Sequence, residues 1–282
     1  MKLKGHSKFK LKFIKNGQNY IVQKSANGEI LKLRLKKQME KQKVFYWLLK
    51  SEKLIKLFFE VPKVLEEKEY LKSYQAKMSF YRGKSIIDII EKGDIFILDN
   101  ILEKLFLFLE WECQHCEYKF LDLKKIYKKL DSLASKTKEI KITTRLKKAF
   151  SKYNQTIIPI GICHGDFTFS NMIFSNKIVL IDFLDSYIET PLQDLSKLLQ
   201  EVNLKWSALM TYKKNDNEKI SIAYNFIQKK VQEKLEGFFV KMNLDKNLIN
   251  LFYQLTLLRI LPYTTNKNIY KLIKGEIQKC LP

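Results

Sequence analysis

The chain carries its clearest signal in the stretch His164-Gly165-Asp166-Phe167-Thr168-Phe169-Ser170-Asn171, which Asp182 follows eleven residues later. Between Asn171 and Asp182 lie two short apolar runs joined by a Ser-Asn-Lys turn at 175–177. Runs of this kind are typical of a tight β-hairpin. Such a hairpin would bring Asn171 and Asp182 to the same end of two neighbouring strands.

These side chains have the chemistry of a phosphoryl-transfer site. An amide oxygen and a carboxylate at neighbouring strand ends suit Mg²⁺, which takes one or two carboxylates and leaves other positions to phosphates and water. Asp166, five residues before Asn171, is then placed to orient an acceptor hydroxyl or to receive its proton. A His-Gly-Asp turn alone is weak evidence, but with Asn171 and Asp182 at these offsets it predicts a phosphotransferase.

The pattern H-G-D-x-x-x-x-N followed by I-D-F resembles the aminoglycoside phosphotransferase and choline kinase family, small-molecule kinases with a protein-kinase-like fold. Gly165 favours this family, because protein kinases usually have Arg there. The resemblance covers roughly residues 5–200. It implies an α+β fold of two lobes, a small antiparallel sheet with one helix and a larger, mostly helical part. We expect a nucleotide-binding lobe over 1–82 and a catalytic and substrate lobe over 83–282.

The resemblance also implies roles for residues of the first lobe. A short turn with Gly5 and Ser7 would cover the ATP phosphates with backbone N–H groups. Lys24, near the end of a predicted strand, corresponds to the lysine that contacts the α- and β-phosphates, and Glu40 corresponds to the glutamate that holds this lysine. Plain alternatives stay open, because N-terminal turns are common and Lys and Glu are abundant in this chain.

A hinge between the lobes is expected over 78–85. By resemblance, backbone groups would hold the adenine there, with the C=O of Ser79 and the N–H of Tyr81 beside Met78. Met78 could equally be a core residue.

Hydrophobic periodicity supports this layout. Apolar residues alternate with Lys over 8–24, and Asn16-Gly17 is a hairpin turn. Apolar residues at helical spacing follow Gly28. The expected elements are a helix over 29–50, strands over 62–65 and 70–80 about a charged turn at 66–69, helices over 86–91 and 94–136, a strand over 157–163, and helices over 203–282 with breaks at 215–217, 243–246 and 262–266.

The net charge of +22 raises the hypothesis of a nucleic-acid partner. Only four of the 52 basic residues are Arg, however, although sites that bind phosphates and bases favour the Arg fork. The Lys residues are spread along the whole chain. We therefore expect mainly solvated surface, with attraction to an acidic substrate or an anionic membrane surface as the alternative, and no specific nucleic acid.

A cytoplasmic protein is expected. The first seventeen residues are rich in Lys and lack the apolar stretch of a secretory signal, and the most apolar region, 95–111, is interrupted by charges. Four cysteines without a disulfide framework fit a reducing compartment. Cys113 and Cys116 have zinc-ligand spacing but lack a second ligand pair, so a helical pair of small residues is the better interpretation.

The sequence therefore predicts an enzyme that transfers the γ-phosphoryl group of ATP or GTP, with Mg²⁺, to a hydroxyl of a small molecule. A sugar or surface-glycan precursor is the favoured acceptor, with choline, ethanolamine or an aminoglycoside as alternatives. A nucleotide-binding pseudokinase with a regulatory role is disfavoured, since Asp166, Asn171 and Asp182 are all present. The roles of two residues stay open. One is Asp185, and the other is Arg259, whose partner would be an internal carboxylate or an anionic substrate.

Overall fold

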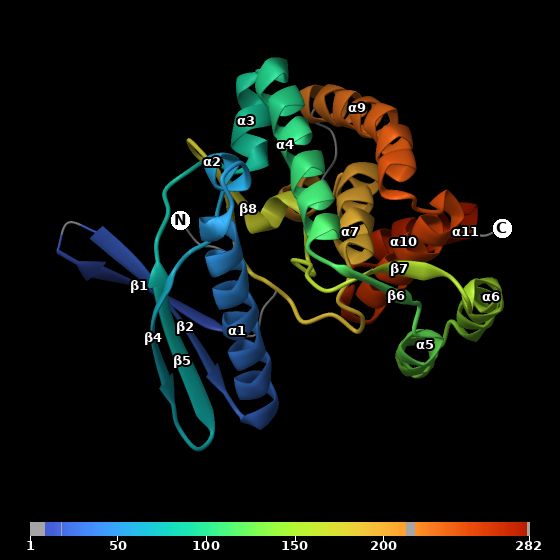
Figure 1. Cartoon of the computed structure of the whole chain (residues 1–282), viewed down its shortest axis with the longest axis horizontal. Helices are drawn as coiled ribbons and strands as arrows, with labels where there is room; N and C mark the ends of the chain where they lie inside the picture. Colours follow the sequence, from blue (N-terminus) through green and yellow to red (C-terminus); the bar gives the residue numbers. More distant parts are fainter. Residues whose placement is uncertain (1–8, 18, 213–217, 281–282) are drawn as a thin grey trace. The chain divides into compact units, whose positions relative to one another are not determined.

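A computed structural model describes residues 9–17, 19–212 and 218–280. By its internal contacts the chain divides into two compact units (Figure 1). Unit 1 comprises residues 1–86 and 170–185, and unit 2 comprises 87–169 and 186–282. This division differs from the expected lobes at 1–82 and 83–282, because the hairpin that follows the catalytic motif pairs with a short strand at residues 59–60.

Unit 1 contains a four-stranded antiparallel sheet in the order β1 (Lys10–Asn16), β2 (Asn19–Asn27), β5 (Ser73–Ser79) and β4 (Val64–Glu69). The predicted N-terminal hairpin is confirmed, and Gly17 in its turn has φ 61°, which glycine adopts without steric cost. β2 is a central strand, so both of its neighbours hold it in register. Lys24 lies opposite Leu11 on one side and Ala76 on the other.

Helix α1 (Glu29–Ser51) packs on this sheet (Figure 1). Leu35 and Met39, four residues apart on one helix face, lie in a core with Ala76 and Met78 of β5. The helical spacing predicted over 29–50 is therefore confirmed, and the core holds α1 against the strand that carries Lys24.

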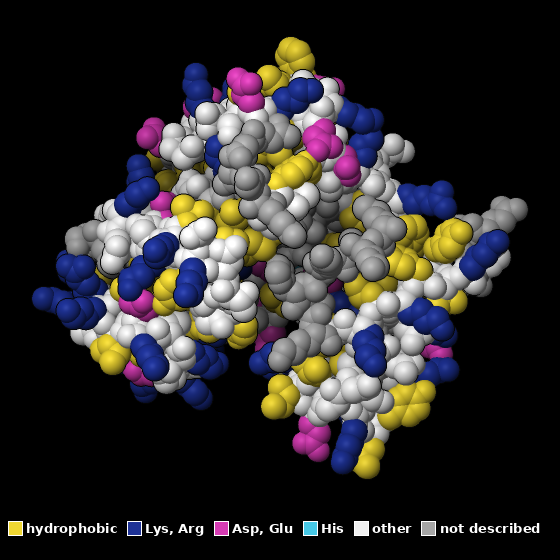
Figure 2. Space-filling model, turned by 180° about the vertical axis from the view of Figure 1, so that it is seen from behind, with side chains coloured by type: hydrophobic (Ala, Val, Ile, Leu, Met, Phe, Trp, Pro, Cys, Tyr) yellow, Lys and Arg dark blue, Asp and Glu magenta, His cyan; other side chains and the backbone are white. Residues whose placement is uncertain are grey.

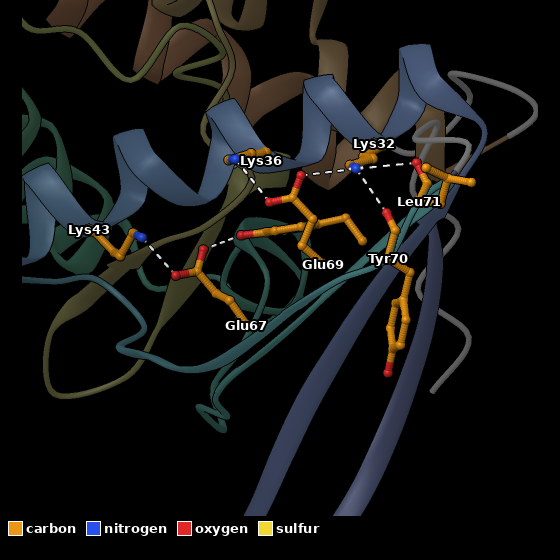
Figure 3. Close-up of polar contacts among 8 residues, drawn as sticks. Lys32, Lys36, Lys43, Glu67, Glu69, Tyr70 and Leu71 are labelled. Carbon is orange, nitrogen blue, oxygen red and sulfur yellow. Dashed lines mark hydrogen bonds and ion pairs between the residues drawn. The ribbon is translucent and has the colours of Figure 1, made fainter.

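Ion pairs fasten α1 to the β4–β5 hairpin (Figure 3). Lys32 and Lys36 each contact the Glu69 carboxylate at 2.9 Å, and Lys43 contacts Glu67 at 2.7 Å. The charged residues 66–69, expected as a turn, are therefore part of β4, because the lysines of α1 pair with its glutamates. Exposed pairs contribute about 0–1 kcal/mol each, so they orient α1 more than they stabilise it.

A second, three-stranded sheet in unit 1 contains the hairpin predicted after Asn171. Strands β8 (Met172–Phe174) and β9 (Ile178–Leu180) are antiparallel, and β3 (Phe59–Glu60), which follows the short helix α2 (Ile55–Phe58), pairs with β9. Two backbone hydrogen bonds of 2.8 and 2.9 Å join Lys84 to Phe174. Gly83 permits this approach, since a Cβ there would lie 2.5 Å from Ile173 Cγ2. The segment expected as a hinge is thus tied to β8.

Unit 2 is mostly helical. Helix α7 (Pro191–Leu204), nearly all of it buried, packs against α4 (Ile95–Gln114), α9 (Glu218–Met242) and α10 (Lys246–Ile260). The predicted strand over 157–163 forms only at 157–160, and the region 94–136 contains an unpredicted strand, β6, which pairs with β7. The helices and strands of unit 2 are α3 (Ile86–Lys92), α4 (Ile95–Gln114), β6 (Glu117–Phe120), α5 (Leu123–Thr137), α6 (Ile140–Phe150), β7 (Ile157–Ile160), α7 (Pro191–Leu204), α8 (Trp206–Thr211), α9 (Glu218–Met242), α10 (Lys246–Ile260) and α11 (Lys267–Cys280).

The predicted α+β class is confirmed. The predicted breaks at 243–246 and 262–266 coincide with the ends of α9 and α10, and the break at 215–217 lies outside the described residues. In the ranges described, every helix is too short or too polar to cross a membrane.

Candidate active site

Lys24 is the centre of the polar cluster in unit 1. Only 3% of its side chain is exposed, and its ammonium forms an ion pair with Asp182 and a hydrogen bond of 3.2 Å to Gln38 Oε1. The ring of Phe9 lies 5.3 Å from the ammonium. A buried charge requires such partners, because leaving water otherwise costs several kcal/mol. The structure thus brings two of the predicted site residues, Lys24 and Asp182, into contact.

Gln38, and not Glu40, is the residue of α1 that contacts Lys24. Positions 38 and 40 lie two residues apart, about 200° around a helix, so they cannot share a face. Gln38 is buried, whereas Glu40 is exposed. The predicted Lys–Glu pair is therefore replaced by a Lys–Gln hydrogen bond, and Asp182 supplies the negative charge. The apolar spacing of Leu35 and Met39 could have placed Gln38 on the inner face.

Asn171 and Asp182 lie at the same end of the β8–β9 hairpin, as the spacing predicted. The N–H of Ile181 donates to the C=O of Asn171 at 3.0 Å, one residue beyond the last pair of the strands. Asp182 has φ 59°, a left-handed conformation that Asp tolerates better than most residues. Its Oδ1 contacts Lys24, and no described residue donates a hydrogen bond to Oδ2. One amide and one carboxylate oxygen therefore fit Mg²⁺.

The other residues that were predicted to contact the nucleotide have different environments in the structure. Gly5 and Ser7 lie outside the described residues. Met78 is buried in the core between α1 and the sheet. The N–H of Ser79 donates to the C=O of Lys63 at 3.0 Å, and burial, with a hydrogen bond to Glu60, raises the pKa of Tyr81 to about 12. The adenine contacts of Ser79 and Tyr81 stay predictions.

In unit 2, Asp194 holds the start of the catalytic loop, here defined as residues 164–169. Its carboxylate accepts hydrogen bonds from the backbone N–H of His164 and, at 2.7 Å, from that of Gly165. Gly165 has φ 86°, which explains why glycine occupies this position. His164 Nδ1 accepts the N–H of Asp166 at 3.2 Å, so the imidazole braces the loop.

Three residues on one face of α7 contact the catalytic loop. Asp194, Lys197 and Glu201 are spaced by three and four residues and therefore lie above one another on the helix. Lys197 Nζ lies 2.9 Å from Asp166 Oδ1, and Glu201 Oε2 accepts the N–H of Phe169 at 3.1 Å. The loop is thus held at its beginning, at the Asp166 carboxylate and at its end.

A second buried carboxylate lies behind Asp194. Burial, and then the neighbouring Asp194 carboxylate, raise the pKa of Glu112 well above its usual range. Two carboxylates cannot both be charged in such a site. Burial therefore favours the protonated form of Glu112 of α4, and the N–H groups of the loop stabilise the Asp194 carboxylate.

Glu201 is expected to stabilise unit 2 through the hydrogen bonds that it accepts. Besides Phe169, it accepts from the N–H and Oγ of Ser207 at 2.9 and 2.7 Å and from Tyr224 OH at 2.8 Å. Glu201→Ala would leave four buried donors without this acceptor, at about 1–3 kcal/mol for each that stays unsatisfied. We expect a loss of about 3 kcal/mol or more in urea unfolding.

The control for this measurement is Glu236→Ala on α9, an exposed glutamate, which should change stability by less than about 0.5 kcal/mol. Equal losses of stability in Glu201→Ala and Glu236→Ala would contradict the stabilising role of the hydrogen bonds that Glu201 accepts.

Lys197, Glu201 and Glu112 were absent from the sequence-based site. The first two gave only a weak signal, because Asp194, Lys197 and Glu201 recur at intervals of three and four in a segment that contains four other polar residues. Glu112 gave no comparable signal, since its role depends on its burial beside Asp194.

Two residues that the sequence left open have partners in the structure. Asp185 forms an exposed ion pair of 3.0 Å with Lys37. Arg259 donates to Gln193 Oε1 at 2.8 Å and lies 5.3 Å from the ring of Tyr187. The partners of Arg259 in the described part of the chain are therefore neutral, and neither is the internal carboxylate that was one of the two expectations.

The Cys113 and Cys116 thiols face backbone and core. Cys116 Sγ accepts the N–H of Ile162 at 3.4 Å. Burial raises the pKa of Cys113 to about 12 and that of Cys116 to about 11. Burial thus favours the protonated form of both thiols at neutral pH.

The segment that contains the catalytic loop also matches a known family. Residues 119–216 match the model described as "Phosphotransferase enzyme family". The resemblance seen in the sequence is confirmed. No curated protein matches the chain.

Solved structures extend the similarity to the fold of the whole chain. A protein assigned as fructosamine-3-kinase from Haemophilus somnus 129PT is 14% identical, with a TM-score of 0.55 and coverage of 100% of this chain and 90% of that one. The aminoglycoside phosphotransferase APH(3'')-Id from Streptomyces rimosus is 15% identical, with a TM-score of 0.51 and coverage of 88% and 92%. Its complex with ADP and streptomycin is 12% identical, with a TM-score of 0.50 and coverage of 90% and 94%.

Identities of this size show the fold alone, and the fold is that of these kinases. The match of residues 119–216 to the phosphotransferase family supports a phosphotransferase, and the fold agrees with a kinase that acts on the hydroxyl group of a small molecule.

Proposed function

We propose that the protein transfers the γ-phosphoryl group of ATP to a hydroxyl group of a sugar-like small molecule. The observation that carries this proposal is the docking of the catalytic loop on α7, which holds Asp166 in an ordered position with 26% of its side chain exposed. A carboxylate that is fixed and still accessible can orient a hydroxyl for in-line attack.

In the proposed reaction a bond forms between the acceptor oxygen and the γ-phosphorus, and the bond to the bridging oxygen of ADP breaks. Asp166 orients the hydroxyl and takes its proton late in the step. Proton transfer to a positioned base of this kind typically contributes a factor of about 10²–10⁴ in rate.

Lys24, Asn171 and Asp182 are the proposed phosphate and metal ligands. Lys24 would contact the phosphates from β2, and its tie to Asp182 keeps the ammonium in place. Asn171 and Asp182 would hold Mg²⁺, which when bound neutralises phosphate charge. ATP and GTP differ in the base, so the segment around Ser79 and Tyr81, which is proposed to contact the base, would select between them.

The acceptor is proposed to be a sugar or a sugar that carries a phosphate or carboxylate. Basic residues outnumber acidic ones after Glu201, and Arg259 has neutral partners. Such a field attracts anionic groups and repels choline or an aminoglycoside. Figure 2 shows Lys and Arg scattered over the face that it draws, between acidic and apolar side chains, which does not resemble the continuous stripe of a nucleic-acid site.

A screen of acceptors tests this function. ADP formation from Mg·ATP would be measured with sugars, sugar phosphates, choline, ethanolamine and aminoglycosides, with Asp166→Asn as the inactive control. We expect turnover with a sugar or sugar phosphate, and for an anionic acceptor a KM that rises between 0.05 and 0.5 M NaCl, the expected effect of screening. Turnover of choline or an aminoglycoside without turnover of any sugar would overturn the acceptor assignment and leave the kinase assignment intact.

A further inference from the structure

Lys197 is a nearly buried cation beside the proposed base. Its side chain is 11% exposed, and its ammonium contacts Asp166 Oδ1 at 2.9 Å and Gln200 Oε1 at 3.0 Å. A lysine ammonium has three donors, and the third finds no protein acceptor among the described residues. Burying an ammonium is costly, so the position needs a reason other than surface solvation.

A purely structural bridge is the simplest alternative, because many buried ion pairs can be replaced by apolar side chains without loss. The contacts of the catalytic loop weigh against it. Asp194 already accepts the N–H groups of His164 and Gly165, and Glu201 accepts that of Phe169. The backbone of the loop is therefore anchored at both ends without Lys197, whose contact is with the reactive side chain itself.

We propose that Lys197 is a positioning residue for Asp166. Its charge stabilises the ionised carboxylate, and its contact with Oδ1 limits the rotation of that carboxylate. An early proton transfer to Asp166 would leave the ammonium without its counter-charge, so Lys197 favours orientation of the hydroxyl first and proton transfer late. This inference rests on the proposed function, in which Asp166 is the base.

A double-mutant cycle tests this role with Mg·ATP as the only substrate and water as the acceptor. Radiolabelled ADP formation would be measured for the full chain, for Lys197→Met, for Asp166→Asn and for the double variant. We expect Lys197→Met to lower kcat about 10- to 100-fold, part of the 10²–10⁴ of a positioned base, and to change the KM for ATP by less than about twofold. In the Asp166→Asn background the same change should lower kcat by less than about twofold, because Lys197 acts through Asp166.

Lys234→Met is the matched control. Lys234 of α9 pairs with Glu103 of α4, its side chain is 19% exposed, and it does not contact the catalytic loop. Its replacement removes a mostly buried lysine from an ion pair in the same unit, although Glu103 is 63% exposed, and should leave kcat within about twofold. If Lys197→Met does not fold, as judged by circular dichroism, Lys197→Gln replaces it in the cycle, since an amide can still bond Gln200.

The outcomes separate this inference from the proposed function. An equal fall of kcat in both backgrounds, or no fall in the background with Asp166, would overturn the role of Lys197. If Asp166→Asn itself left turnover unchanged, the proposed function would fail instead.

Discussion

Asp182→Ala is expected to abolish the Mg²⁺-dependent part of ATP binding. Among the described residues, Asp182 is the carboxylate at the end of the β8–β9 hairpin and the counter-charge of Lys24, so its loss would remove the proposed metal ligand and free the lysine. At an ATP concentration of 100 Kd the unmodified protein should gain about 2.7 kcal/mol of stability. The variant should gain no more with Mg²⁺ than without it, which thermal unfolding in the two conditions measures.

Two further variants make the result interpretable. Asp182→Asn tolerates the φ of 59° better than Ala and removes only the charge, so it should lose the same Mg²⁺ dependence without a backbone penalty. Asp185→Asn removes a nearby exposed carboxylate that pairs with Lys37 and should bind Mg·ATP normally. An unmodified protein that ATP stabilises equally with and without Mg²⁺ would reject the metal assignment.

Asp166→Asn is expected to lower turnover by about 10²–10⁴, the usual contribution of a positioned base. The substitution keeps the size of the side chain, and the loop backbone stays bonded to Asp194 and Glu201. ATP affinity should therefore change by less than about threefold. Steady-state kinetics with the acceptor from the screen, together with the ATP thermal shift, separate the two quantities.

The matched control is Asp131→Asn on α5, where an exposed carboxylate pairs with Lys147. It should leave both turnover and ATP affinity within about twofold. If ATP affinity in Asp166→Asn fell as far as turnover, Asp166 would be a nucleotide-binding residue and its role as the base would be wrong.

Much of the fold was predictable because local patterns specify it. The alternation over 8–24 and the turn at Gly17 gave the first hairpin, and the helical spacing gave α1. Where local patterns conflict with distant partners, the prediction was wrong. The acidic run 66–69 has the composition of a turn, yet it forms part of β4 because lysines of α1 neutralise it.

In the candidate site, too, local patterns were predicted correctly and a contact with a distant partner was not. Residue type and spacing along the chain predicted the hairpin that brings Asn171 beside Asp182, since both lie within one local unit. The partner of Lys24 was assigned to the wrong residue of α1, because Gln38 and Glu40 differ only in the face of the helix that they occupy.

The sequence by itself determined the class of chemistry, because Asp166, Asn171 and Asp182 lie within seventeen residues and their offsets follow from one loop and one hairpin. The resemblance to a known family pointed to Lys24 among the many lysines, and the tertiary structure showed its burial beside Asp182. Only the tertiary structure added Lys197, which resembles the other lysines in the sequence and is distinguished by its burial beside Asp166. Burial and charge pairing depend on packing in three dimensions, which the order of residues does not display.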